Sequence, residues 1–403
     1  MTLSSETASR YAGRALDHLR HLSQEMGPRG SCTSGERAAA DYVAGQLQKM
    51  GLDQVECQDF RGAPSAYHRY AIVFCTGLAG AAIAFAVRTP AAAWIAFALQ
   101  GLAAWGMLQE SDFAANWTRW IVPGRPSQNV IGKIPPKDRW QQRVILTAHM
   151  DTHRTPFFNT SRRWQLAFQL LFRSLWVSLL AAMFLFLLYA LTERVGLLRL
   201  ALLPELLLLS GTVLFLHPDQ TPFSPGAYDN ASGVGSVLAL AERLLVEPLV
   251  HTEVWAVFLG CEENGSEGSA AFLKQYALQG QETFLINLDM MGCGKLYIRT
   301  EEGFLVRRRP PESMLTLARR VSTALPELGV YERPSQAFSD ATIAYKMGLK
   351  ALSLGTGPRS PASPIYRHTL SDTVDHVELE ALQDTHRYVL ALLQTIDQEG
   401  GHA

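Results

Sequence analysis

The sequence predicts an α/β fold with a mixed, mostly parallel sheet, helices on both faces, and two inserted transmembrane helical hairpins. Short apolar runs bounded by turn residues, such as those ending at Ala148, Cys261 and Leu288, are typical of buried strands. Helix-like stretches at 231–245 and 266–276 follow such segments, and strand and helix in alternation favour a sheet covered on both faces. Long apolar stretches elsewhere predict the hairpins.

Side chains that bind metals stand at the ends of the three predicted strands. Each run is followed within three residues by such groups, namely His149 and Asp151, Glu262 and Glu263, and Asp289. In open α/β sheets, ligands collect beyond the carboxyl ends of parallel strands. We therefore expect these side chains to lie close together.

Two further candidates lie in loop-like phrases. Asp229 belongs to Gly-Ala-Tyr-Asp-Asn-Ala-Ser-Gly, and His368 belongs to Tyr-Arg-His-Thr-Leu-Ser-Asp-Thr. Taken singly, these motifs also have structural interpretations. Asp229, followed by Asn and Ser, is typical of a turn with a helix N-cap. A pair such as Glu262 and Glu263 is typical of the start of a helix. Together they form a set of nitrogen and oxygen donors without thiolates, which favours a catalytic metal site over a structural one.

These phrases, in this order, resemble the co-catalytic zinc aminopeptidases of metallopeptidase family 28. Relatives in that family include glutamate carboxypeptidase, glutaminyl cyclase and the transferrin receptor ectodomain. The resemblance covers most of the chain outside two apolar inserts and includes the segments 29–31, 35–42 and 49–52, the stretch from Asn129 to Asp151, and the chain from Gly226 onward.

The resemblance implies a centre of two Zn²⁺ ions held by five ligands, His149, Asp229, Glu263, Asp289 and His368. Asp229 would bridge two metals about 3.5 to 4 Å apart. His149 and Asp289 would complete one metal, and Glu263 and His368 the other.

The resemblance also gives roles to Glu262 and Asp151, and a third residue is a candidate by its position in the sequence. Glu262 would take a proton from the attacking water and pass it to the leaving amine. Asp151 would hydrogen-bond the His149 imidazole and fix its tautomer. Tyr366 is a candidate oxyanion stabiliser, because it lies close to His368 in the sequence.

The other histidines lack such context, and we interpret them as surface or packing residues: His18, His21, His68, His153, His217, His251, His376, His386 and His402. Ser339 and Asp340 match a family segment near the site but receive no role. The Pro/Ser-rich loop 358–364 precedes His368 and is expected either to line the substrate pocket or to be a plain connection.

Four apolar stretches reach or approach the roughly 18 to 20 residues that cross a bilayer. They are 70–87, 91–108, 168–191 and 195–216, and they form two hairpins over 70–108 and 166–216. Buried helices of a large soluble core are the alternative, but residues 179–188 contain no polar side chain at all. The expected organisation places the peptidase domain in 1–66 with 115–160 and in 222–403.

An even number of crossings puts both termini and both parts of the peptidase domain on one side of the membrane. Arginines are more numerous at the peptidase ends, at 61, 69, 119, 125, 154, 162 and 163, than at the hairpin tips, at 88, 194 and 199. This bias predicts a cytoplasmic peptidase domain. No removable signal peptide is expected, and five cysteines are compatible with a reducing compartment. A formal net charge of −1 gives no reason to expect nucleic acid as a partner.

The second hairpin interrupts the chain between the first ligand and Asp229, so the active site is expected to face or lie close to the bilayer. Apolar peptides or N-acylated amino acids are therefore the hypothesised substrates. Within this hairpin, Arg173 and Glu205 either pair with each other or act separately, with Arg173 snorkelling to the interface and Glu205 facing a partner subunit.

Several function classes remain open. The leading one is a membrane-bound di-zinc aminopeptidase that hydrolyses amide bonds in apolar peptides. An N-acyl amino acid amidohydrolase and a glutaminyl-cyclase-like acyltransferase are alternatives, and a catalytically inactive receptor or scaffold is a further one. His149 with Asp151 argues against the single-metal cyclase, and Glu262 with the complete ligand set argues against the inactive protein.

Overall fold

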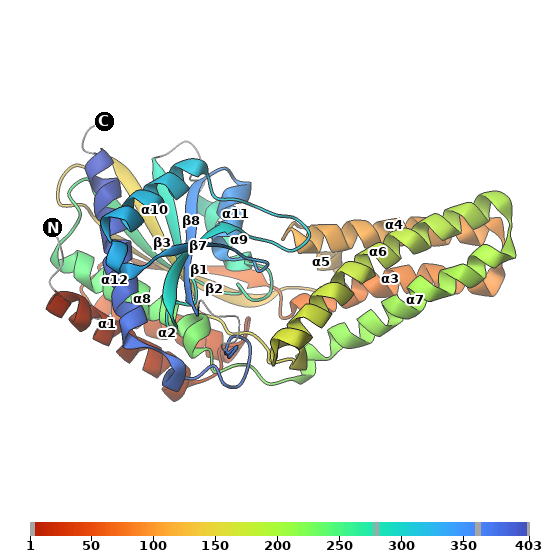
Figure 1. Ribbon diagram of the computed structural model, residues 1–403, viewed down its shortest axis with the longest axis horizontal. Coiled ribbons are helices and arrows are strands. Elements are labelled where there is room, and N and C mark those ends of the chain that lie inside the picture. Colours follow the sequence, from red (N-terminus) through yellow and green to blue (C-terminus); the bar gives the residue numbers. More distant parts are fainter. Residues whose placement is uncertain (1–4, 277, 279–281, 359–363, 401–403) are drawn as a thin grey trace. The chain divides into compact units, whose positions relative to one another are not determined.

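A computed structural model describes residues 5–276, 278, 282–358 and 364–400 of the chain. Its internal contacts divide the chain into two compact units (Figure 1). We call the first the sheet unit; it comprises Met1–Pro64, Arg125–His153 and Phe223–Ala403. The second, the helical unit, comprises Ser65–Gly124 and Arg154–Pro222.

The sheet unit contains an eight-stranded sheet in the order β1-β2-β4-β3-β5-β8-β6-β7. The strands are β1 Val55–Gly62, β2 Arg125–Ile134, β3 Gln142–His149, β4 Thr252–Leu259, β5 Thr283–Leu288, β6 Lys295–Glu301, β7 Tyr331–Pro334 and β8 Lys350–Gly357. The pairs β3–β4, β3–β5, β5–β8 and β6–β7 are parallel, and the other three are antiparallel. The predicted mixed, mostly parallel sheet is confirmed.

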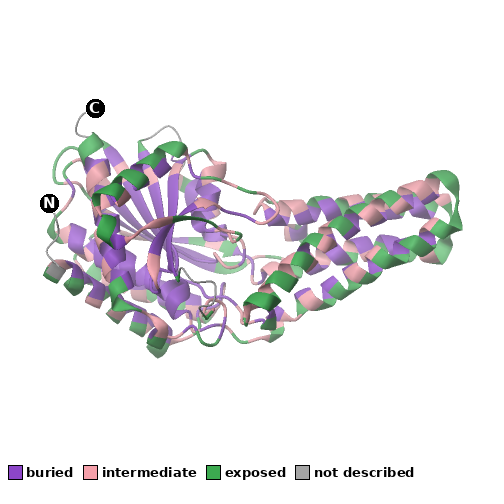
Figure 2. Cartoon of the chain, viewed as in Figure 1, coloured by how far each residue is buried: buried purple, intermediate pink, exposed green. Residues whose placement is uncertain are grey.

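Helices cover both faces of this sheet. Successive side chains of a strand point to opposite faces, and in β4 Val254, Ala256 and Phe258 join the main core while Trp255 packs against Phe272 of α9. Figure 2 shows the strands as buried throughout most of their length. The helical segments of the unit are α1 Ser5–Arg20, η1 His21–Met26, α2 Ser34–Lys49, η4 Ala227–Ala231, α8 Ser232–Val246, α9 Glu267–Tyr276, α10 Glu312–Ala324, η5 Pro326–Leu328, α11 Asp340–Lys346, η6 Val374–His376 and α12 Leu379–Gly400.

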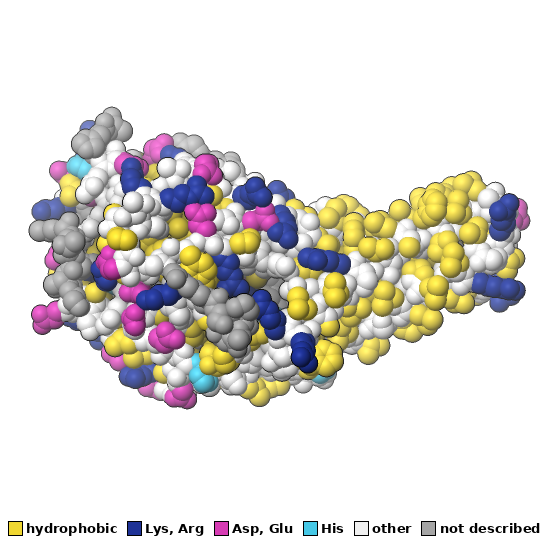
Figure 3. All heavy atoms as spheres, in the orientation of Figure 1, with side chains coloured by type: hydrophobic (Ala, Val, Ile, Leu, Met, Phe, Trp, Pro, Cys, Tyr) yellow, Lys and Arg dark blue, Asp and Glu magenta, His cyan; other side chains and the backbone are white. Residues whose placement is uncertain are grey.

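The helical unit is built from α3 Ala66–Val87, α4 Pro90–Ser111, α5 Thr118–Ile121, η2 Phe157–Asn159, α6 Arg162–Thr192, α7 Val195–Leu216 and η3 Pro218–Gln220. Among the described residues, four of its helices are long and apolar enough to cross a membrane by length and composition. Apolar side chains cover most of the visible surface of these helices, and basic side chains gather towards the ends (Figure 3). Leu170, Leu203 and Val213, for example, are each at least 65% exposed, which is unusual for a surface that faces water.

The boundaries between the units differ from the expected ones. Residues 115–124 and 154–160, expected in the peptidase domain, belong to the helical unit. Asn116 Nδ2 and Thr118 Oγ1 donate hydrogen bonds to Glu110 Oε1 of α4, at 2.7 and 2.5 Å. Phe158 stacks on Phe168 of α6 with the ring centroids 4.1 Å apart. These contacts bind both short segments to the apolar helices.

Glu205 of α7 has a different contact from the one expected. Its carboxylate accepts a hydrogen bond from Gln100 of α4, whose amide also donates to the Gly77 carbonyl at 3.1 Å. Arg173 is exposed on α6. The contact that holds Glu205 is therefore an amide from the other hairpin, and the snorkelling of Arg173 stays a prediction.

Candidate metal centre

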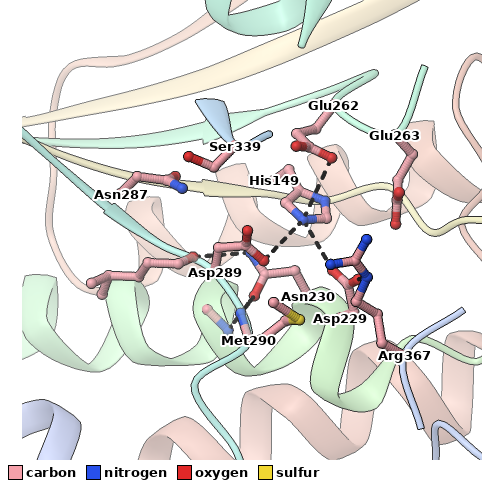
Figure 4. A network of polar contacts seen from close by, with 12 residues as sticks. His149, Asp229, Asn230, Glu262, Glu263, Asn287, Asp289, Met290, Ser339 and Arg367 are labelled. Carbon is pink, nitrogen blue, oxygen red and sulfur yellow. Dashed lines mark hydrogen bonds and ion pairs between the residues drawn. The ribbon is translucent and has the colours of Figure 1, made fainter. Parts of the chain in front are cut away.

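Three neighbouring strands deliver three of the predicted ligands to one edge of the sheet. His149 is the last residue of β3, Glu263 lies four residues beyond the end of β4, and Asp289 directly follows β5. Because β4, β3 and β5 are adjacent and parallel, their carboxyl ends meet at this edge. The structure thus brings these side chains together, as Figure 4 shows.

Two loops supply the remaining ligands. Asp229 lies in η4 with the non-helical angles φ −117° and ψ 95°, and His368 has a φ of 59°. A left-handed backbone is uncommon for histidine and is often found at functional sites. Asp372 accepts the backbone N–H groups of Tyr228 and Asp229 at 2.6 and 3.1 Å. It therefore links the loop of His368 to the loop of Asp229.

The Asp229 carboxylate lies between two histidines. Its Oδ1 is 3.2 Å from His149 Nε2, and its Oδ2 is 3.1 Å from His368 Nε2. His149 Nε2 is also 3.8 Å from Asp289 Oδ1, and His368 Nε2 is 3.2 Å from Glu263 Oε2. The five predicted ligands thus form two histidine–carboxylate pairs that share one further carboxylate.

The donor atoms of this centre suit a cation. Among the described residues, Asp229 Oδ1 and Glu263 Oε1 are buried without a hydrogen-bond partner. A buried carboxylate oxygen without a hydrogen bond is costly, so two of them in one centre call for a positive charge. Nitrogen and oxygen donors without a thiolate are the set found in catalytic zinc sites. The residues present therefore fit zinc.

The electrostatics of the centre depend on groups behind the ligands. Burial raises the pKa of Asp289, but Arg299 holds it below its usual value. Arg299 Nη2 lies 2.6 Å from Asp289 Oδ2, and its Nη1 lies 3.4 Å from Glu302 Oε1. Arg299 is fully buried on β6, ten residues after Asp289. No signal in the local sequence marks it.

Glu262, the predicted general base, faces the centre with its Oε2 3.9 Å from His149 Nε2. Burial raises its pKa well above the usual value; His149 opposes this rise, and the negative charges of Glu263 and Asp340 add to it. Asp340 begins α11, is fully buried, and has no hydrogen-bond partner for either carboxylate oxygen among the described residues. The sequence matched Asp340 to a family segment but gave it no role.

Asp151 contacts the backbone of Glu262 and Glu263 and also the imidazole of His149. Its carboxylate accepts the backbone N–H groups of Glu262 and Glu263, both at 3.1 Å, and the Ser31 hydroxyl at 2.6 Å. The hydrogen bond from His149 Nδ1 goes to the backbone oxygen of Asp151 at 3.1 Å, whereas the nearer carboxylate oxygen is 3.5 Å away. The predicted contact with the imidazole therefore exists mainly through the backbone.

Tyr366 lies against a different group of side chains. Its ring stacks on His376 with the centroids 4.0 Å apart and packs against Tyr228 and Cys293. Among the described residues, no hydrogen bond joins its hydroxyl to the five ligands. The neighbouring Arg367, which the sequence did not single out, has its Nε 3.6 Å from Asp229 Oδ2. Most of the loop 358–364, at 359–363, lies outside the described residues.

His153 was expected to be one of the surface or packing histidines. It is a packing residue, buried beside the centre, where its ring stacks on His368 with the centroids 3.8 Å apart. Ligand atoms of His153, Glu263 and His368 all lie within 4.8 Å of one another. Its position in His149-Met-Asp-Thr-His153 is the sequence signal that could have revealed it.

Comparison with known proteins relates part of the chain to a peptidase family. Residues 210–393 match peptidase family M28. This part of the chain is a peptidase family M28 domain. The chain is also 30% identical over 184 residues to aminopeptidase YwaD of Bacillus subtilis. That match covers 43% of this chain and 38% of the relative, so the chain aligns with well under half of the length of the curated relative.

Solved structures share the fold over nearly the whole chain. The zinc aminopeptidase BSAP from Bacillus subtilis superposes with a TM-score of 0.55 at 18% identity, covering 95% of this chain and 94% of that one. A glutaminyl cyclase from Bacteroides thetaiotaomicron superposes with a TM-score of 0.54 at 17% identity, covering 98% of each chain. The predicted zinc aminopeptidase-like fold is confirmed, and a peptidase and a cyclase share it.

Proposed function

We propose that this chain is a membrane-bound di-zinc metallopeptidase that hydrolyses amide bonds, with aminopeptidase action on apolar peptides as its leading activity. The observation that carries the proposal is the Asp229 carboxylate, which faces His149 with one oxygen and His368 with the other. The M28 domain and the similarity to aminopeptidase YwaD support a zinc-dependent hydrolase.

His149 and Asp289 would hold one zinc, Glu263 and His368 the other, and Asp229 would contact both. The His149 Nδ1 faces a backbone carbonyl, which only accepts hydrogen bonds, so Nδ1 carries the proton. Its Nε2 is then left with a lone pair directed towards Asp229 and Asp289, as a metal ligand requires.

Bound zinc supplies a Lewis acid for the amide carbonyl and a water of lowered pKa. Glu262 lies on the His149 side of the centre and is not needed as a ligand, so it is the residue to accept the proton of the attacking water and deliver it to the leaving amine. The Asp151 carboxylate holds Glu262 in place by accepting a hydrogen bond from the backbone N–H of Glu262. Tyr366 or another donor would stabilise the oxyanion.

We propose that α3, α4, α6 and α7 cross a bilayer and that the sheet unit lies on the cytoplasmic side. The apolar length of the helices and the arginine bias of their flanks support this topology. Reporter fusions at the C-terminus and at the α6–α7 turn test it. The C-terminal fusion is expected to be cytoplasmic and the turn fusion to lie on the opposite side.

The α6–α7 hairpin is tethered by two ligand loops. The chain leaves the sheet unit after His153, four residues beyond His149, and returns at Phe223, six residues before Asp229. This connection supports substrates that are apolar and reach the enzyme at the membrane surface. The idea fails if the purified enzyme cleaves hydrophilic peptides as well as apolar ones and is indifferent to lipid and detergent.

An N-acyl amino acid amidohydrolase uses the same centre, and a glutaminyl-cyclase-like acyltransferase uses the same fold. Metal analysis separates these classes: about two zincs per chain support the hydrolase, about one supports the cyclase, and none supports an inactive scaffold. His149 has its own carboxylate partner in Asp289, which favours two.

The decisive experiment combines this metal count with a panel of aminoacyl and N-acyl amide substrates in detergent. Glu262→Gln is the control, because it removes the proton acceptor and leaves the five ligands intact. We expect unchanged zinc content and a loss of turnover of at least about 100-fold. Turnover that survives this substitution would remove Glu262 from the mechanism.

A further inference from the structure

Arg367 is a partly exposed arginine beside the metal centre. In Figure 4, Arg367 lies next to Asp229. Its Nε is 3.6 Å from Asp229 Oδ2, beyond hydrogen-bond distance, and its side chain is 35% exposed whereas that of Asp229 is 5% exposed. Among the described residues, Arg367 makes no other ion pair and no hydrogen bond. About a third of its side chain is therefore open to solvent beside the centre.

The other arginine of the centre is used differently. Arg299 is fully buried and divides its guanidinium between Asp289 and Glu302. Among the described residues, the ion pair of Arg367 is with Asp229, the carboxylate that the two metals would share, while Glu263 and Asp289 act on it from farther away. When that carboxylate ligates cations, it offers Arg367 little negative charge, and five N–H donors in a planar fork remain for an external anion.

We propose that Arg367 binds the free carboxylate of the substrate, one residue beyond the scissile bond. This proposal rests on the hydrolase function above and specifies its substrate class. Arg367 lies beside Asp229, the carboxylate that would contact both metals, so an anionic group of a substrate bound at the metals lies near its guanidinium. Arginine matches a carboxylate with two parallel hydrogen bonds.

The substrates that carry such a group are dipeptides and N-acyl amino acids. In a longer peptide the same position holds a neutral amide, which gives the guanidinium no opposite charge. Hydrolysis of a dipeptide or an N-acyl amino acid releases an amino acid whose carboxylate remains on Arg367 until the product leaves. Dipeptides and N-acyl amino acids with a free carboxylate are therefore preferred to longer peptides and to the corresponding amides.

The test compares substrates that differ only at this group. Leu-Phe is paired with Leu-Phe-amide, and N-lauroyl-phenylalanine with N-lauroyl-phenylalaninamide, using the zinc-loaded full-length enzyme in detergent. We expect kcat/KM to be about 10- to 100-fold higher for the acid of a cleaved pair, the range that a charged hydrogen-bonded contact provides. Arg367→Gln removes this preference mainly through KM of the acid, and Arg367→Lys restores part of it.

Arg320→Gln is the matched control, because Arg320 is an exposed arginine of α10 that pairs with Glu399. It is expected to keep the preference for acids. Zinc content and thermal stability of each variant show that the centre is intact. A second measurement avoids turnover: calorimetry on zinc-loaded Glu262→Gln is expected to detect phenylalanine binding at least about 10-fold tighter than phenylalaninamide binding, and Arg367→Gln in that background removes the difference.

Two outcomes overturn the assignment of Arg367. One is equal cleavage of acids and amides by the unaltered enzyme. The other is an equal fall in kcat for both members of a pair in Arg367→Gln, which would make Arg367 a stabiliser of the reacting oxygen instead. A different result, in which the zinc-loaded enzyme cleaves none of the substrates, contradicts the hydrolase function itself.

Discussion

The backbone oxygen of Asp151 lies 3.1 Å from Nδ1 of His149, so a residue two positions along the chain fixes which imidazole nitrogen faces the centre. The carboxylate of the same Asp151 is left to hold the backbone of Glu262 and Glu263. One residue thus positions a predicted ligand on β3 and the predicted base and ligand after β4.

Asp151→Asn tests this double role. The substitution keeps the backbone oxygen but places an N–H₂ group against the N–H donors of Glu262 and Glu263. We expect zinc affinity, measured by competition with a chelator, to fall about 10- to 100-fold, the usual effect of disturbing groups behind metal ligands. Ser31→Ala removes only one hydrogen bond to Asp151 and is expected to have a smaller effect.

Ser322→Ala is the matched control for Ser31→Ala, because Ser322 of α10 forms hydrogen bonds with the Ala318 carbonyl and with Tyr388 of α12. It is expected to leave zinc affinity unchanged. Unaltered zinc affinity in Asp151→Asn would show that Asp151 does not position the centre.

His153 is expected to support the second metal by packing against His368. Its ring is nearly parallel to that of His368, at 12°. His153→Ala removes this support and is expected to weaken one of two zinc equivalents about 3- to 10-fold, the worth of an aromatic pair. His153→Phe keeps the stacking and should cost less than about 3-fold. Zinc titration with a chromogenic chelator measures the affinity of both variants. An equal loss of zinc affinity in His153→Ala and His153→Phe would instead make His153 a direct ligand.

The parts of the centre that local sequence determines could be predicted, whereas contacts between residues far apart in the sequence could not. His149, Glu263 and Asp289 each end a short apolar run, so local sequence and the rule for parallel strands together place them at one edge. Arg299 reaches Asp289 because β6 pairs with β8 and β8 with β5, a topology that no local pattern encodes. Arg367 stands directly beside the predicted His368, yet its contact with Asp229 depends on how two distant loops meet.

The helical unit shows the same limit. Hydropathy alone predicts four long helices, and the structure has helices that include 70–87, 91–108, 168–191 and 195–216. The boundaries were less predictable, since hydrogen bonds to Glu110 help to hold Asn116 and Thr118 in this unit. The contact of Glu205 with Gln100 likewise joins two hairpins that are separate in the sequence.

Arg299→Met is expected to destabilise the metal-free protein by about 3 to 5 kcal/mol, because it leaves the buried carboxylates of Asp289 and Glu302 without their cation. Urea unfolding followed by circular dichroism measures the change. Arg320→Met removes an exposed ion pair and is expected to cost less than about 1 kcal/mol. Similar losses in both variants would mean that Arg299 is not needed to compensate these charges.

Acid is expected to destabilise the sheet unit through two buried histidines. Burial lowers the pKa of His386, and also that of His18, to about 4. Both are therefore neutral in the folded chain at pH values where an unfolded histidine, with a pKa near 6.5, is already protonated. Stability from each group is fully present above about pH 6.5 and is lost progressively as pH falls towards about 4, by up to roughly 3 kcal/mol per group.

His386→Phe isolates this effect, because a phenyl ring can keep the stacking on Tyr11, where the ring centroids are 5.1 Å apart, but cannot bind a proton. Urea unfolding at several pH values, with a chelator present so that metal release does not contribute, measures the slope of stability against pH. The variant is expected to lose less stability than the parent between pH 6.5 and 4, by up to roughly 3 kcal/mol. Identical slopes would show that His386 takes up a proton as readily in the folded chain as in the unfolded one, contrary to its burial beside Arg243.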